Sequence, residues 1–221
     1  MIKNNLINIK NSIPEDVLLV AVSKTKPIEA IQEAYETGHR NFGENKVQEL
    51  ADKFDHLPKD IKWHMIGHLQ RNKVKFIAPF IHLIHGVDSF KLLKEINKQA
   101  LKNNRIINCL LQFHIAEENT KFGLHLDEAI SFISNQEFLE LKNISISGVM
   151  GMASFTEDNS KIEKEFSSLI AIFDKLKTQF NNKDSFKWIS MGMSGDYKIA
   201  INQGSNMVRI GSTIFGNRQI N

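Results

Sequence analysis

A lysine stands just beyond the first strongly apolar run of the chain. Residues 17–22 read Val-Leu-Leu-Val-Ala-Val, and Lys24 follows after one serine. A run of this kind is typical of a strand buried on both faces, so a lysine at its end is partly removed from water. Desolvation and a nearby cation lower the pKa of a lysine, and the neutral amine forms Schiff bases with carbonyl compounds. Lys24 is therefore a candidate nucleophile.

Two alternatives to this interpretation stay open on the residues alone. A lysine whose charged end simply reaches solvent is the commoner case. Lys26 has the same strand parity as Lys24, so the alternation of side chains cannot choose between them. Because Lys26 adjoins Pro27, in the loop that leads into the next helix, we expect it to be the more exposed of the two.

Two glycine- and hydroxyl-rich turns near the end of the sequence could bind a phosphate. The first contains Gly192 and Ser194, and the second follows Arg209 and contains Gly211 and Ser212. Glycines let the backbone approach an anion, to which backbone N–H groups and hydroxyls donate. Either turn alone is more often an ordinary tight turn. Because both follow predicted strands at the end of the fold, together they favour a phosphate site.

Arg209 lies two residues before Gly211, at the end of a short predicted strand. If its side chain points inward, the guanidinium could meet a heteroaromatic nitrogen or a second anionic group. A structural salt bridge is an equally good interpretation. A reactive lysine, a phosphate-binding turn and an arginine at one end of a sheet together predict a phosphorylated aldehyde as the ligand.

Other chemistries lack their motifs. Residues 211–216 have the glycine spacing of a P-loop, but Asn-Arg follows where Lys and Ser or Thr are needed. No G-x-G-x-x-G follows a predicted strand, and residues 192–196 lack the second glycine of a nucleophile elbow. His64 and His68 have the spacing of a metal-binding pair, but Gly67 interrupts the helix that such spacing requires. We interpret both as core or rim histidines.

The composition is that of a soluble globular protein. The chain has 221 residues, of which 42% are hydrophobic and 24% charged, and its net charge of +3 comes from no basic block, so nucleic-acid binding is not indicated. The single cysteine, Cys109, lies in an apolar run and is interpreted as a small core residue in a reducing compartment. With no signal peptide and no membrane-length apolar run, we expect a cytoplasmic protein with no membrane partner.

Short β-rich runs alternate with amphipathic helical segments along the whole chain. Among the helices, 162–176 has the clearest apolar spacing, and a further one is predicted over 69–76. Eight such units favour a closed (β/α)8 barrel of the TIM type, a single domain over residues 1–221, rather than an open doubly wound sheet. The predicted strands are 17–22, 41–43, 61–66, 82–87, 106–115, 144–150, 186–191 and 207–210. In such a barrel the loops after the seventh and eighth strands commonly bind phosphate.

Six blocks of residues, in order along nearly the whole chain, resemble the YggS/PROSC family of pyridoxal phosphate homeostasis proteins. They are residues 21–27 (Ala-Val-Ser-Lys-Thr-Lys-Pro), 42–45 (Phe-Gly-Glu-Asn), 63–67 (Trp-His-Met-Ile-Gly), 148–152 (Gly-Val-Met-Gly-Met), 190–194 (Ser-Met-Gly-Met-Ser) and 208–211 (Val-Arg-Ile-Gly). The resemblance implies a barrel of the alanine racemase N-terminal-domain kind, fold type III, that binds pyridoxal 5′-phosphate (PLP).

By the same resemblance, PLP is held as an internal aldimine on Lys24, which selects Lys24 over Lys26. The matched cofactor-binding residues are Lys24, Asn45, Ser194, Arg209, Gly211 and Ser212. Among these, Asn45 would lie beside the cofactor and Arg209 would face the pyridine nitrogen. The phosphate would be held by Ser194, Gly211 and Ser212. Many members have Thr in place of Ser212 and Pro in place of His68, so the resemblance assigns no role to His68.

The function that the resemblance implies is buffering or delivery of PLP rather than catalysis. A permanently charged Arg209 cannot readily protonate the pyridine nitrogen, which leaves the ring a poor electron sink. Racemases of this barrel type use a tyrosine from an added C-terminal domain as the opposing base. This sequence ends at Asn221, directly after the eighth unit, and has tyrosines at positions 35 and 197 alone.

We therefore expect a monomeric PLP carrier, without a catalytic residue or a metal site, whose partners are PLP and apo forms of PLP-dependent enzymes. The alternatives are an amino-acid racemase or other PLP-dependent enzyme, and an aldolase that acts on a phosphosugar through Lys24.

Overall fold

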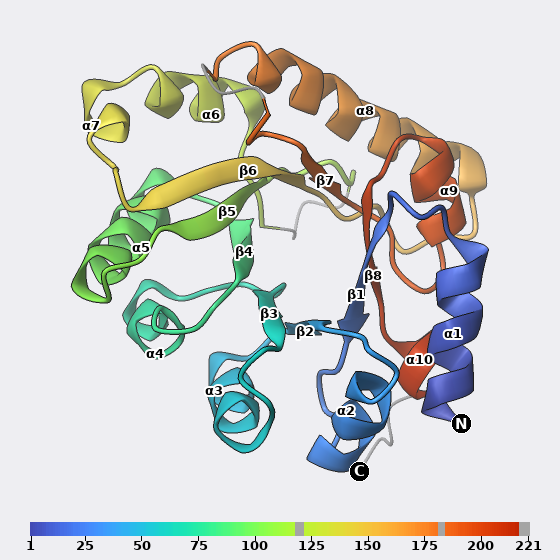
Figure 1. Cartoon of the computed structure of the whole chain (residues 1–221). Helices are drawn as coiled ribbons and strands as arrows, with labels where there is room; N and C mark the ends of the chain where they lie inside the picture. Colours follow the sequence, from blue (N-terminus) through green and yellow to red (C-terminus); the bar gives the residue numbers. More distant parts are fainter. Residues whose placement is uncertain (118–121, 181–183, 217–221) are drawn as a thin grey trace.

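Eight parallel strands form a closed barrel, with helices packed around its outside (Figure 1). A computed structural model describes residues 1–117, 122–180 and 184–216. Each strand pairs with the next one along the chain, and β8 pairs with β1 to close the ring. The predicted (β/α)8 barrel is confirmed. The strands are β1 (Leu18–Val22), β2 (Asn41–Glu44), β3 (Lys62–Met65), β4 (Leu83–Val87), β5 (Ile107–Gln112), β6 (Ile144–Met150), β7 (Trp188–Ser190) and β8 (Met207–Ile210).

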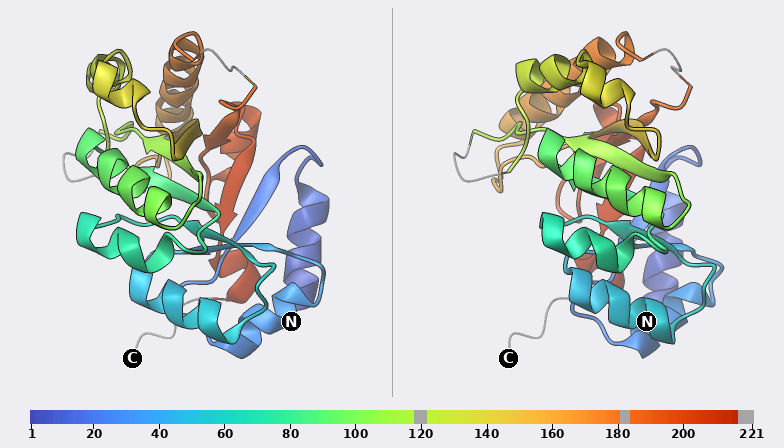
Figure 2. Two further views of the ribbon diagram at one scale, coloured as in Figure 1. Left: turned by 60° about the vertical axis from the view of Figure 1, so that its left-hand side comes forward. Right: turned by 90° about the vertical axis from the view of Figure 1, so that its left-hand side faces the viewer.

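The helices cover the outer face of the barrel, as the two views of Figure 2 show. They are α1 (Ile2–Ser12), α2 (Ile28–Tyr35), α3 (Val47–His56), α4 (Val74–Ile77), α5 (Phe90–Lys102), α6 (Leu126–Ile133), α7 (Gln136–Leu139), α8 (Asn159–Lys177), α9 (Tyr197–Asn202) and α10 (Ser212–Phe215), with a 3-10 turn at Arg71–Lys73. The predicted helix over 162–176 is confirmed as α8, whose apolar residues face the barrel. Asp158 caps its first turn by accepting from the backbone of Lys161 at 3.2 Å.

One helical prediction was wrong in its extent, and one helix was missed. The segment 69–76 is not one helix: Gln70 is extended, with φ −70° and ψ 136°, and a 3-10 turn then leads into the four-residue α4. Gln70 makes no side-chain cap, so the first backbone donors lack the partner that would start the helix earlier. The N-terminal helix α1 was not predicted. It buries Leu6 and Ile9, and the Asn5 amide donates to the carbonyl of Ile214 at 3.1 Å.

The core has two parts, one between the strands and the helices and a smaller one inside the barrel. On β1, Leu19 and Ala21 belong to the outer cluster and Val20 to the inner one, as the alternation of a strand requires. The predicted burial of Cys109 is confirmed, and it raises the pKa of the thiol. The inner cluster consists of Val20, Leu83, Leu110, Met150 and Met207.

Polar side chains occupy the next inward positions of three strands. Two residues further along the same face, Leu83 is followed by His85, Leu110 by Gln112 and Met207 by Arg209, and all three polar residues are buried. On these three strands the barrel interior is therefore apolar toward the beginning of the strand and polar toward its C-terminal end. In barrels of this type the C-terminal end is where ligands bind.

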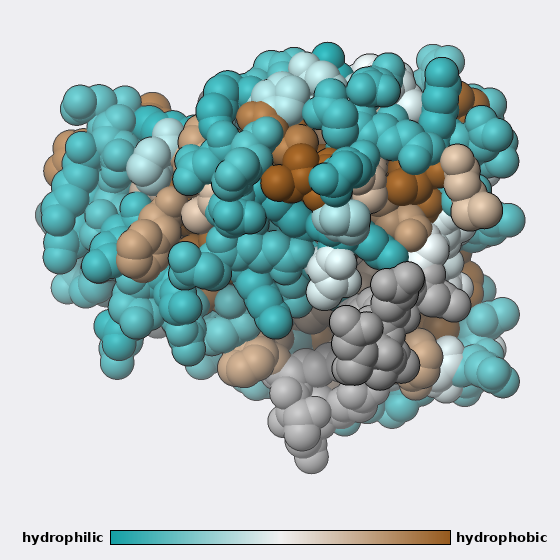
Figure 3. Space-filling view, turned by 90° about the horizontal axis from the view of Figure 1, so that it is seen from below, coloured by the Kyte–Doolittle hydropathy of each residue, from teal (hydrophilic) through white to brown (hydrophobic). Residues whose placement is uncertain are grey.

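The outer surface is predominantly hydrophilic on the face seen in Figure 3, where hydrophobic atoms form small separate groups. Phe155 and Phe122 are among the exposed large hydrophobic residues. Among the helices of the described residues, none combines the length and apolar character needed to cross a membrane.

The contact between β6 and β7 depends on a glycine. Gly148 has φ +150° and pairs with Trp188, and a Cβ atom there would lie 1.9 Å from the Trp188 carbonyl oxygen. We expect Gly148→Ala to lower the free energy of unfolding by roughly 3 kcal/mol, because both the backbone conformation and the strand spacing must change. Urea denaturation measures the difference.

Gly195→Ala is the matched control for this substitution. No atom lies within 4 Å of a Cβ built on Gly195, so its unfolding free energy should stay within about 0.5 kcal/mol of the wild type. Equal losses in the two variants would contradict the strand-spacing argument.

Candidate functional site

Lys24 lies at the C-terminal mouth of the barrel, in the turn that follows β1. Lys24 is two residues after Val22 and four after Val20, so it follows the inward-facing positions of β1. Its side chain is half-buried. The turn is closed by the Lys26 N–H, which donates to the Ser23 carbonyl at 3.0 Å. Lys26 is also half-buried, so the expectation that it is the more exposed of the two is not confirmed. Its ammonium donates to the carbonyl of Gly216 at 3.0 Å.

Arg209 lies on the inward face of β8, next to Val20 of β1 in the strand register. Its side chain is 3% exposed, and the guanidinium binds neutral acceptors. Nη1 donates to the carbonyl of Ser190 at 2.8 Å and to its hydroxyl at 2.6 Å, and Nη2 donates to the carbonyl of Gly151 at 3.1 Å. Within the described residues no carboxylate lies at ion-pair distance, so the structural salt bridge is not formed there.

Burial lowers the pKa of Arg209 to about 10, and the carboxylate of Asp196 opposes this shift. The guanidinium therefore remains charged at neutral pH. A buried cation that is surrounded by neutral acceptors favours an anionic or electron-rich ligand beside it.

A chain of hydrogen bonds crosses the barrel interior from β2 to Arg209. His64 Nε2 lies 3.2 Å from Asn41 Oδ1, and His64 Nδ1 lies 2.9 Å from His85 Nε2. His85 Nδ1 lies 3.0 Å from the Ser190 hydroxyl, which accepts from Arg209. The chain joins one residue from each of β2, β3, β4, β7 and β8, so it spans the polar half of the barrel.

The direction of donation along this chain follows from the acceptor at its end. Burial lowers the pKa of both His64 and His85 well below 6.5, so each ring is neutral and carries one proton. Asn41 Oδ1 can only accept, so His64 donates from Nε2 and accepts at Nδ1. His85 must then donate from Nε2 and accept the Ser190 hydroxyl proton at Nδ1. Ser190 thus presents its lone pairs to Arg209.

The two turns predicted to bind a phosphate lie together at the mouth. The Gly211 N–H donates to the hydroxyl of Ser194 at 3.3 Å, which links the turn after β7 to the turn after β8. A Cβ atom on Gly211 would lie 3.1 Å from the Val22 carbonyl oxygen, so a glycine lets this turn approach β1 closely. Ser212 is exposed and begins α10. Backbone N–H groups and hydroxyls thus gather beside the strand that carries Lys24.

Asn45 follows β2 on the same rim. Its Oδ1 atom is buried and has no hydrogen-bond partner among the described residues. Gly67 lies directly against it, since a Cβ atom there would be 2.5 Å from the Asn45 carbonyl oxygen. A buried amide oxygen without a partner is costly unless a ligand supplies one. The Asn45 oxygen calls for a hydrogen-bond donor, whereas the buried Arg209 cation and the Ser194 turn suit an anion, so together they fit a polar ligand that carries both a donor and an anionic group.

Glu44 and Lys53 are buried polar residues near Lys24 that the sequence analysis did not single out. Glu44 ends β2 and Lys53 lies on α3, and their side chains form an ion pair of 2.8 Å. Burial raises the pKa of Glu44 to about 7, with the Lys53 ammonium opposing the shift. The signal available in the sequence was a glutamate inside a strand, where a buried carboxylate needs a partner.

The histidine predictions divide into two outcomes. His64 is buried in the core, as interpreted, but its part in the hydrogen-bond chain was not foreseen. His68 lies on the rim, where Nδ1 is 3.1 Å from Asp88 Oδ2 and the ring stacks on Phe122 with 4.2 Å between centroids. Throughout the described part of the chain, no group of three or more potential metal ligands occurs.

The closed barrel places the protein in the class of the alanine racemase N-terminal domain. Residues 1–219 match the family model described as the N-terminal domain of alanine racemase. An alanine racemase of Clostridium difficile 630 shares this fold with a TM-score of 0.80 at 17% identity, over all of this chain and 57% of that one.

Relatives of higher sequence identity identify the family within this class. A protein of Vibrio alginolyticus is 39% identical over 93% of this chain and 88% of its own length, and one of Aquifex aeolicus is 37% identical over 91% and 87%. Both are named pyridoxal phosphate homeostasis protein. PipY of Synechococcus elongatus PCC7942, solved with PLP bound, has a TM-score of 0.87 and 30% identity over 98% of this chain and 100% of its own. This chain belongs to the family of pyridoxal phosphate homeostasis proteins, so the resemblance is confirmed.

We expect His64 and His85 to be neutral Nε2–H tautomers, because Asn41 fixes the direction of donation. Long-range ¹H–¹⁵N spectra of histidine-labelled protein distinguish the tautomers, and neither ring should titrate between pH 8 and pH 5. A proton on Nδ1 of either ring would contradict the assigned direction.

The same neutrality makes stability depend on pH. Below pH 6.5 the unfolded chain binds protons at these histidines and the folded chain does not, so each histidine lowers stability by about 1.4 kcal/mol per pH unit as the pH falls. Glu44 has the opposite effect between pH 7 and pH 4.5. There the folded chain binds a proton at Glu44 more tightly than the unfolded chain does, so this residue raises the free energy of unfolding as the pH falls. Because two histidines oppose one glutamate, we expect these three groups to give a net loss of stability from pH 6.5 to 5 in urea denaturation. A net gain of stability from these three groups over the same pH range would require one of the two imidazole rings to be charged in the folded protein.

Proposed function

We propose that this protein binds PLP on Lys24 and buffers or delivers the cofactor inside the cytoplasm. The observation that carries the proposal is the adjacency of the Lys24 strand to Arg209, a buried cation bound by neutral acceptors. The relatives named pyridoxal phosphate homeostasis protein, and the PLP-bound PipY structure, support the choice of ligand.

Each predicted site residue has a role in this proposal. When bound, PLP supplies an aldehyde carbon open to attack by an amine and a pyridine ring that draws electrons. Lys24 provides the amine and forms the covalent link through a Schiff base. Asn45 binds beside the ring with its buried amide. The phosphate is held by the hydroxyls of Ser194 and Ser212 and by the backbone at Gly211, with Gly211 N–H exchanging its Ser194 partner for the anion.

Arg209 orients the pyridine nitrogen without protonating it. With a pKa of about 10 the guanidinium keeps its proton at neutral pH, and its Nη1 and Nη2 atoms are held by Ser190 and Gly151. A neutral pyridine withdraws electrons weakly, so deprotonation of a bound amino acid is not favoured. This property suits a carrier that must hold a reactive aldehyde without turning over substrates.

The two tyrosines have partners that also favour a carrier. The Tyr35 hydroxyl donates to Asp60 Oδ1 at 2.8 Å, and the Tyr197 hydroxyl lies 3.4 Å from the Ser12 hydroxyl. Neither contact involves a proposed cofactor-binding residue. We propose a single-domain monomer over residues 1–221 that passes PLP to apo forms of PLP-dependent enzymes and has no catalytic residue of its own.

The covalent link is tested by borohydride reduction of the PLP-loaded protein and peptide mapping. We expect a visible absorption band in the loaded protein and a reduced adduct on Lys24. Lys24→Ala should lose the adduct, because the other lysine of this turn, Lys26, has its ammonium bound to the carbonyl of Gly216. Lys26→Ala is the matched control and should keep it. Recovery of the adduct on another residue, or of none at all, would overturn the assignment.

Carrier and enzyme are separated by α-deuterium exchange on a panel of amino acids in D₂O. We expect exchange far below ordinary enzymatic rates, because Arg209 leaves the ring unprotonated. Rapid exchange that Lys24→Ala abolishes would instead establish the alternative, a PLP-dependent racemase or related enzyme. An inactive protein that still shows the Lys24 adduct is the outcome expected of a carrier.

A further inference from the structure

We propose that Lys53, acting with Glu44 and Glu49, is the positioning group that holds Lys24 in its orientation at the barrel mouth. The inference rests on the proposed function in one respect, that Lys24 is the residue that binds the cofactor. The proposal concerns residues that touch the backbone on both sides of Lys24 and not the cofactor itself.

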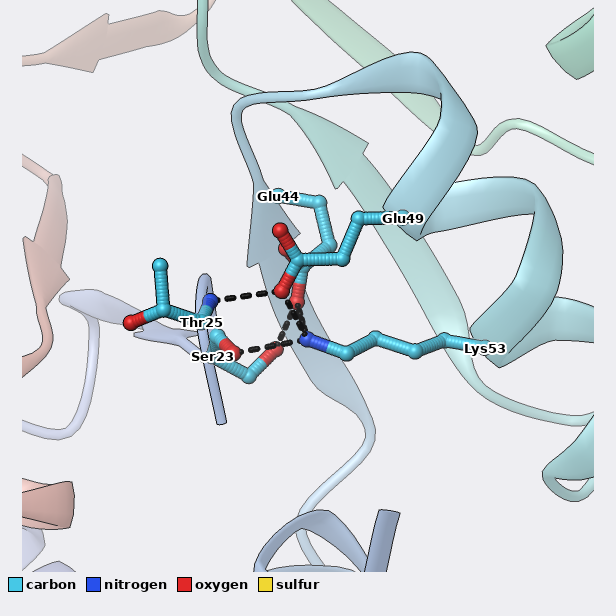
Figure 4. A network of polar contacts seen from close by, with 5 residues as sticks. All are labelled: Ser23, Thr25, Glu44, Glu49 and Lys53. Atoms are coloured by element: carbon cyan, nitrogen blue, oxygen red, sulfur yellow. Dashed lines mark hydrogen bonds and ion pairs between the residues drawn. The ribbon is translucent and has the colours of Figure 1, made fainter. Parts of the chain in front are cut away.

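The Lys53 ammonium uses its full donor capacity within this group (Figure 4). The side chain is 4% exposed, and Nζ donates to the Ser23 carbonyl at 2.8 Å, to Glu44 Oε1 at 2.8 Å and to Glu49 Oε1 at 2.6 Å. A lysine ammonium has three N–H groups, so every donor has an acceptor. Its geometry is therefore determined by three partners rather than by one.

The same group binds the residues before and after Lys24. Ser23 is held twice, since its carbonyl accepts from Lys53 and its hydroxyl donates to Glu44 Oε1 at 2.6 Å. The Thr25 N–H donates to Glu49 Oε1 at 2.5 Å. Lys24 lies between two clamped backbone positions, and all of these contacts come from β2 and α3 rather than from its own strand.

The conformation of Thr25 explains why such a clamp is needed. Its φ of +64° lies in the left-handed region, which a β-branched residue adopts only when its surroundings impose it. The bond from the Thr25 N–H to Glu49 opposes relaxation of this turn. If the turn relaxed, the Lys24 side chain would project from the backbone in a different direction.

Electrostatics make Lys53 the central member. Two carboxylates share one ammonium, and Glu44 lies in a fully buried position where its second oxygen has no partner among the described residues. Without the ammonium, Glu44 and Glu49 would repel each other and Glu44 would be left as an uncompensated buried acid. The partner of Thr25 would then be lost together with that of Ser23.

A displaced Lys24 loses its alignment with the other residues of the site. A misplacement of about 1 Å in a reacting group can cost on the order of a hundredfold in rate. Because the clamp acts on the backbone at Lys24, its loss should weaken the covalent link to the cofactor more than it weakens the fold. This difference separates a positioning role from a merely structural one.

The experiment compares Lys53→Met, Lys53→Arg and Leu50→Ala with the wild type. Leu50 is buried on the same helix but belongs to the apolar core, so Leu50→Ala destabilises α3 without touching the clamp. Two readouts are used: the hydrogen-exchange rate of the Thr25 amide in the PLP-free protein, and the rate of PLP release from the loaded protein into a large excess of a scavenging amine.

We expect Lys53→Met to raise the Thr25 exchange rate and to speed PLP release at least tenfold. Lys53→Arg, which keeps a donor cation, should recover much of both effects. Leu50→Ala should lower the melting temperature while leaving release within about twofold of the wild type. Equal release rates in Lys53→Met and the wild type, or equal acceleration in Lys53→Met and Leu50→Ala, would overturn the positioning role.

Failure of the proposed function is distinguishable from failure of this inference. If the wild type forms no adduct on Lys24, the carrier proposal fails, while the Thr25 exchange rates still report whether Lys53 holds the turn. If Lys53→Met does not fold, Glu49→Ala is the substitute, because Glu49 is partly exposed and its truncation removes the acceptor of the Thr25 N–H directly. It should speed both Thr25 exchange and PLP release, and no change in either would contradict the clamp.

Discussion

Pairing of β8 with β1 is the contact on which the site depends. This pairing closes the barrel and sets Arg209 beside Val20, so that the last strand contributes a cation to the interior that the first strand helps to line. Without closure, Lys24 and Arg209 would lie at opposite edges of an open sheet. The turns after β7 and β8 reach the Lys24 strand for the same reason, with Gly211 packed against Val22.

The two halves of the barrel interior differ in polarity. An apolar layer fills the half toward the strand beginnings, and His64, His85, Ser190 and Arg209 fill the half that opens to the mouth. The histidines remain neutral because burial penalises their charged forms, so they support the guanidinium as dipoles and not as counter-ions. Arg209 thus has no carboxylate at ion-pair distance among the described residues, which suits its proposed place beside an anionic or electron-rich ligand.

A second polar group, outside the barrel interior, acts on Lys24 from α3 and β2. Lys53 and Glu44 connect the turn after β1 to its neighbours, while the histidine chain supports Arg209. The two groups orient different residues by the same principle, which is that a buried polar atom takes a fixed position when all of its hydrogen bonds are made by protein.

The sequence by itself determined the local features: eight strands in order, the helix at α8, Lys24 at the end of the first strand and hydroxyl-rich turns after the last two. These follow from side-chain periodicity and turn residues, which act over a few positions. Tertiary structure decided that α1 exists and that His64, His85 and Lys53 belong to networks around Arg209 and Lys24. Those outcomes depend on contacts between residues far apart in the chain, such as His85 with Ser190, whose geometry is defined only when the barrel closes.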